Sequence, residues 1–77
     1  MPTQYEVAAV LEDVCKAVLK PYGVKDFNNL DEETLFTIAI ACFSAARAAV
    51  VAAKGGSDDE ARAWFEHLIA DRWKRQP

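Results

Sequence analysis

The sequence predicts an all-α protein, an antiparallel three-helix bundle with a long, alanine-rich central helix. Three observations support this fold class. The 77-residue chain has only three glycines and three prolines, too few for a turn-rich all-β fold. Its composition, 52% apolar and 27% charged, is that of a folded globular chain. Its apolar residues recur at helical spacing in three segments, each with its own start and stop signals.

The length of the chain allows one small domain, and we expect residues 1–77 to form a single helical domain. A domain of this size buries only about 60% of the surface that its unfolded chain exposes. It therefore needs very regular packing, a cross-link or a partner chain. The formal net charge of −3 argues against a nucleic-acid partner.

The first helix is expected over residues 4–20. Thr3 and Glu6 have the spacing of a capping box, in which the threonine hydroxyl accepts a hydrogen bond from the glutamate amide. Pro21 and Gly23 end the helix. Its apolar side is made of Val7, Leu11, Val14 and Val18.

The connector that follows is not polar, because it carries Tyr22, Val24, Phe27 and Leu30, and we expect it to fold back onto the core. The second helix is expected over residues 32–54. Asp31 is its N-cap, and the pair Gly55-Gly56 supplies a left-handed stop.

The third helix is expected over residues 58–75. Ser57 and Glu60 form a second capping box at its start. Its first turn carries Asp58, Asp59 and Glu60 and its last turn carries basic residues, and both groups are accounted for by the helix dipole and capping. Its buried face is predicted from the spacing of Ala61, Trp64, Phe65, Leu68 and Ile69.

The central helix is unusually apolar, because between residues 35 and 53 only Thr37, Ser44 and Arg47 are not apolar. We do not expect it to cross a membrane, since many of its residues are alanine and Arg47 would lie deep in lipid. Two of its three sides carry small residues, which allow another helix to approach closely and to insert bulky side chains such as Trp64, Phe65 or Leu11. The third side, here called the aromatic stripe, consists of Phe36, Ile40, Phe43, Arg47 and Val50.

Two interpretations of the aromatic stripe follow from the sequence. Two neighbouring helices can cover the two small-residue sides, which leaves the stripe without a partner. Either Val24 and Phe27 of the connector cover it as an ordinary part of the core, or it meets a second chain. Aromatic residues beside an arginine are enriched at the centres of protein interfaces.

The sequence offers no set of catalytic residues and no metal site. His67 is the single histidine, and Asp71 lies one helical turn after it, but no nucleophile accompanies them. The spacing of the acidic residues matches no calcium loop. We therefore expect no enzymatic activity, no metal and no other cofactor. Cys15 and Cys42 lie in apolar segments, and without a secretion signal we expect reduced thiols and a cytoplasmic location.

Taken together, these observations predict a non-enzymatic protein-interaction module, homodimeric, that binds and regulates or inhibits a larger protein. The aromatic stripe is the predicted partner-binding surface. The alternative is a nucleic-acid-binding accessory protein that uses the basic end of the third helix, where Trp73 could stack on a base. The residues of that alternative are Arg72, Trp73, Lys74 and Arg75.

Overall fold

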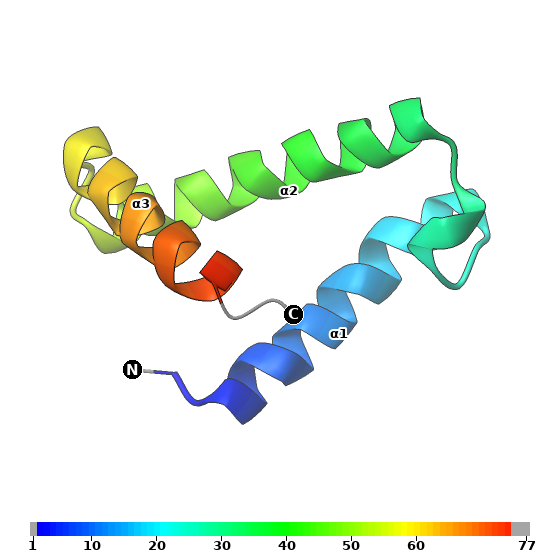
Figure 1. Ribbon diagram of the computed structural model, residues 1–77, viewed down its shortest axis with the longest axis horizontal. Coiled ribbons are helices and arrows are strands. Elements are labelled where there is room, and N and C mark those ends of the chain that lie inside the picture. Colours follow the sequence, from blue (N-terminus) through cyan, green and yellow to red (C-terminus); the bar gives the residue numbers. More distant parts are fainter. Residues whose placement is uncertain (1, 75–77) are drawn as a thin grey trace. The chain divides into compact units, whose positions relative to one another are not determined.

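The computed structural model describes residues 2–74, and this part of the chain is all helical, with three α-helices and no strand (Figure 1). The helices are α1 (Gln4–Leu19), α2 (Glu32–Ala53) and α3 (Asp58–Lys74). Two short 3-10 helices, η1 (Lys20–Tyr22) and η2 (Phe27–Asn29), lie between α1 and α2. The all-α prediction is confirmed. α1 and α2 each end one residue before the expected position, and Arg75 lies outside the described residues.

The starts of α1 and α3 are set by side chains that the sequence identified. The Thr3 hydroxyl accepts a hydrogen bond from the Glu6 amide at 3.1 Å, and the Ser57 hydroxyl accepts one from the Glu60 amide at 3.2 Å. At the start of α2, the carbonyl of Asp31 accepts from the Leu35 amide at 3.0 Å. Local side-chain capping therefore determines where α1 and α3 begin.

The connector between α1 and α2 is ordered by its own short-range hydrogen bonds. Gly23 ends η1 with a φ of +67°. The Asp26 carboxylate caps η2 by accepting from the Asn28 amide at 2.9 Å and from the Asn29 side chain at 3.2 Å. The apolar residues of the connector differ in exposure: Val24 and Leu30 are half-buried, whereas Tyr22 and Phe27 are exposed.

The chain divides into two compact units, residues 1–39 and residues 40–77, with the division inside α2. The first unit contains α1, both 3-10 helices and the beginning of α2, and its buried residues are Leu19 and Ile38. The second unit contains the rest of α2 and α3, and its buried residue among those described is Ala61. Neither unit has an extensive core of its own.

The turn between α2 and α3 is a Schellman motif. The Gly56 amide donates to the Val51 carbonyl at 2.8 Å, and the Gly55 amide donates to the Ala52 carbonyl at 3.2 Å. Both glycines have a positive φ, +66° at Gly55 and +91° at Gly56. The predicted left-handed stop at Gly55-Gly56 is confirmed, and it directs the chain into α3 after Ser57.

Replacing Gly55 by alanine is expected to lower the free energy of unfolding by about 1–2 kcal/mol, because an L-residue at this φ is strained. A Cβ atom at Gly55 would meet nothing within 4 Å, so the loss comes from the backbone and not from a clash. Gly55→Asn is the matched control and should lose less, since asparagine tolerates this conformation. Urea unfolding followed by circular dichroism measures both. Equal stability of Gly55→Ala and the wild type would contradict the assignment.

Candidate protein-binding groove

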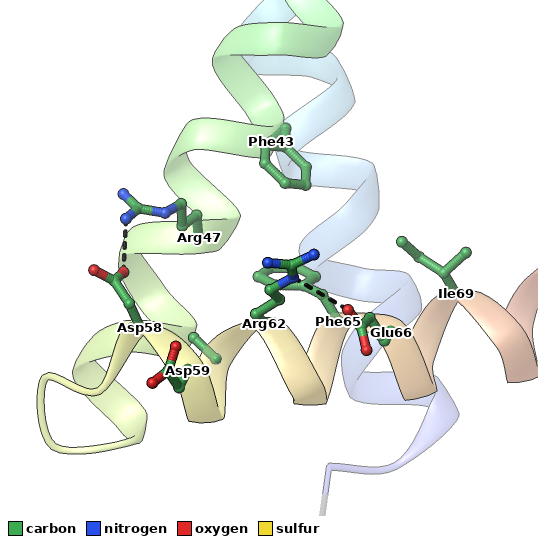
Figure 2. A pocket seen from close by; sticks show the side chains of 9 residues that line it. Phe43, Arg47, Asp58, Asp59, Arg62, Phe65, Glu66 and Ile69 are labelled. Atoms are coloured by element: carbon green, nitrogen blue, oxygen red, sulfur yellow. Dashed lines mark hydrogen bonds and ion pairs between the residues drawn. The ribbon is translucent and has the colours of Figure 1, made fainter.

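An open groove of about 450 Å³ runs along the second unit between α2 and α3, and we call it the α2–α3 groove (Figure 2). Phe43 and Arg47 line it from α2. The turn at Gly55-Gly56 brings α3 back toward α2, so that the other lining residues belong to α3. These residues of α3 are Asp58, Asp59, Ala61, Arg62, Phe65, Glu66 and Ile69.

Aromatic rings form the apolar part of the groove. The ring centroids of Phe43 and Phe65 are 5.5 Å apart with a tilt of 36°, and the ring of Trp64 meets Phe65 edge-on at 5.3 Å. These separations are those of favourable aromatic pairs. Ala61 is only 2% exposed, and its small side chain forms the floor of the groove. Phe43 and Ile69 remain 55% and 52% exposed, so the apolar wall is open to a partner.

The rim of the groove carries charges of both signs. Arg47 Nη2 lies 2.6 Å from Asp58 Oδ1, and Arg62 Nε lies 3.2 Å from Glu66 Oε1 (Figure 2). The first pair joins α2 to the first turn of α3, and the second lies within α3. All four side chains are more than half exposed, so each pair contributes little to folding stability. Both arginines therefore have carboxylate partners inside the chain.

The aromatic stripe divides into two parts in the structure. Phe36 and Ile40 are 60% and 68% exposed. Farther along α2, Phe43 contacts Phe65, Arg47 pairs with Asp58, and Val50 is half-buried. The structure thus brings Phe43 and Arg47 of the stripe against α3 and leaves Phe36 and Ile40 open.

The side of α2 that Phe65 contacts differs from the sequence-based expectation. The small-residue sides were expected to receive the bulky side chains of α3, whereas Phe65 lies against Phe43 of the aromatic stripe. Two rings in contact bury more apolar area than a ring on an alanine methyl group, which favours this arrangement. The sequence contained one indication that α3 lies against the aromatic stripe. Because the turn at Gly55-Gly56 is short, Asp58 lies near the end of α2, within reach of Arg47.

The small-residue sides of α2 are exposed, apart from Cys42, which is half-buried. The two hydroxyl groups of α2 need no outside partner, because Thr37 donates to the Glu33 carbonyl and Ser44 to the Ile40 carbonyl, both at 2.9 Å. Within residues 2–74, α2 is the one helix long and apolar enough to cross a membrane by length and composition alone. The core helix of a soluble protein meets the same criterion.

The described residues contain no group of three or more histidine, cysteine or acidic side chains that could hold a metal ion. His67 is exposed on α3. Cys15 and Cys42 are both half-buried and form no disulfide.

The basic end of α3 is exposed as far as the structure describes it. Arg72 is exposed and Trp73 is 77% exposed. Lys74 is the last residue of α3, and Arg75 lies outside the described residues. This end of α3 places an aromatic ring and a cation in solvent, and it contributes nothing to the α2–α3 groove.

Comparison of the chain with protein-family models, with curated proteins and with solved structures gives no significant match.

The Arg47–Asp58 pair is expected to orient side chains more than to stabilise the fold. A double-mutant cycle with Arg47→Ala and Asp58→Ala should give a coupling energy below about 1 kcal/mol in urea unfolding, and this energy should fall as salt is added. The exposure of both side chains is the reason. A coupling of several kcal/mol that resists salt would mean that the pair is buried in the assembled protein.

Proposed function

We propose that the protein is a non-enzymatic, cytoplasmic interaction module that associates with itself and binds and regulates a larger protein. The observation that carries this proposal is the exposure of its apolar side chains. Among the described residues, thirteen large apolar side chains are exposed, whereas the buried apolar residues are Leu19, Ile38 and Ala61. Soluble proteins that function alone rarely leave large contiguous apolar patches in water.

The proposal includes an antiparallel three-helix bundle in the functional state. α1 presents an apolar side that is largely exposed, with Val10 and Leu11 at 62% and 58%. Burying such aliphatic surface contributes about 25 cal/mol per Å², which is a large driving force for a chain this small. Packing this side onto another helix of the chain would form a core that neither unit has alone.

A bundle of three helices still leaves part of α2 uncovered. A helix that is apolar on every side is stable in water only where other elements surround it. In the structure α3 covers only part of the aromatic stripe, through Phe43 and Arg47, so the rest of the stripe is open to another chain. The exposed Phe36, Ile40 and Phe43 supply the aromatic and aliphatic anchors that interface centres favour, and Arg47 lies beside them.

A protein surface is a better partner for α2 than a lipid bilayer is. Arg47 lies well inside α2 and already pairs with Asp58, an acidic residue of a helix rich in charge. Placing α2 in a bilayer would bring this ion pair close to hydrocarbon, at a cost of several kcal/mol. The proposal therefore includes no membrane partner.

Phe43→Glu is expected to abolish association while leaving the protein folded. A charge at the centre of an apolar interface opposes assembly, and loss of one central aromatic anchor typically costs about 2 kcal/mol or more of binding energy. Light scattering after size exclusion should give twice the chain mass of 8.5 kDa for the wild type and the monomer mass for the variant. Circular dichroism should show unchanged helicity and a cooperative melt.

Tyr5→Glu is the matched control, because Tyr5 is 79% exposed at the start of α1 and lies outside the stripe. It should keep the mass of the wild type. Loss of helicity in Phe43→Glu would assign Phe43 to the monomer core instead. A wild-type chain that is monomeric at high micromolar concentration would contradict self-association.

A nucleic-acid contact at the end of α3 is the second candidate function, and the exposed ring of Trp73 beside Arg72 favours it. We expect fluorescence polarisation to show no binding of duplex or single-stranded DNA, because the chain carries a net charge of −3. Binding at low salt that weakens steeply as salt is added, and that is lost in Trp73→Ala, would establish this function in place of the first.

A further inference from the structure

On the face of α3 that borders the groove, residues of complementary size and charge lie at equal distances on the two sides of Phe65. Ala61 and Ile69 lie four residues to either side of it, and Asp58 and Arg72 lie seven residues to either side. Four and seven residues are about one and two helical turns, so all five side chains share one face of α3. Four of them line the α2–α3 groove, and Arg72 is exposed on the next turn beyond it.

This symmetry makes the face complementary to a second copy of itself. In two identical antiparallel helices related by a twofold axis at Phe65, each residue meets the residue equally far on the other side of Phe65 in the partner. Asp58 then meets an arginine, Ala61 meets an isoleucine, and Phe65 meets its own copy. Opposite charges and a small residue against a large one are the pairings that a twofold interface requires.

The structure leaves these groups free to pair in this way. Ile69 is half exposed and lines the groove together with Ala61, so it can contact a partner there. Asp58 holds Arg47 through one oxygen, Oδ1, and two thirds of its side chain is exposed. Its carboxylate can therefore accept from a second arginine.

We propose that the occupant of the α2–α3 groove is a second copy of this chain, docked with its α3 antiparallel and the twofold axis at Phe65. The inference rests on the self-association proposed above and specifies its geometry. The charges on the rim of the groove favour a second copy of this chain over other partners. The rim carries Arg47 and Arg62 against Asp58, Asp59 and Glu66, so it can pair with its own copy, whereas a rim of one sign would repel itself.

Cysteine cross-linking tests this geometry directly. In the full chain with Cys15→Ala and Cys42→Ala, we would compare Asp58→Cys, Arg72→Cys and the variant that carries both changes, under mild oxidation. The two positions are about 21 Å apart along one helix, far beyond the Cα separation of about 7 Å that a disulfide spans. A disulfide between them must therefore join two chains.

The antiparallel geometry predicts a covalent dimer in the double variant and little or none in either single variant. A parallel α3 pair would instead cross-link each single variant to itself, which would overturn the inference. Absence of cross-linking in a protein that light scattering shows to be dimeric would also overturn it, while leaving the proposed self-association intact. A wild-type monomer would contradict both, and would indicate that the chain covers its own groove.

A charge-reversal series provides a second test that needs no new thiol. Arg72→Glu places like charges opposite each other and should weaken dimerisation about tenfold. Adding Asp58→Lys should restore most of the affinity, because the pair is re-formed with its signs exchanged. Failure of the double reversal to improve on Arg72→Glu, with helicity unchanged by circular dichroism, would overturn the pairing.

Discussion

The structure depends on one constraint, the need to remove the apolar surface of α2 from water. In this helix of 22 residues, the two hydroxyl groups donate hydrogen bonds to carbonyl groups of α2 itself, and apolar residues lie on all sides of the helix axis. Two short neighbouring helices cannot cover all of this apolar surface. Ile38 is the one buried residue of α2, while Phe36, Ile40 and Phe43 are exposed. The aromatic contact of α3 covers part of this surface, and the proposed dimer would cover more of it.

The helix ends could be predicted from the sequence because they depend on neighbours three or four residues away. Thr3 and Ser57 cap amides on the same turn, and Gly55 and Gly56 close the end of α2 through hydrogen bonds within the same segment. The two 3-10 helices were not predicted. Asp26 was the available signal for η2, since an aspartate side chain can accept a hydrogen bond from the backbone amide two residues ahead.

The candidate site could be predicted only on its α2 side. Helical spacing identified the aromatic stripe, because spacing along one helix depends on local geometry alone. Spacing does not say which face of α3 meets which side of α2, since three sides of α2 were apolar and each could accept an aromatic ring. Phe65 was therefore assigned to an alanine side, and Asp58 was interpreted as a residue of the first turn with no role across the turn. Contacts between helices depend on the shape of both partners, and one sequence pattern does not contain that information.

The pair formed by Arg47 and Asp58 has a consequence for how α2 is oriented about its own axis. A helix covered by alanines on two sides and larger apolar groups on the third can rotate or slide between neighbours with little change in buried area. Thr37 and Ser44 cannot prevent this, because their hydroxyl groups are bonded within α2 and move with it. Arg47 is different, since its partner lies on another helix at 2.6 Å. Together with the contact between Phe43 and Phe65, this exposed ion pair holds one side of α2 toward α3, and that side supplies the α2 residues of the groove.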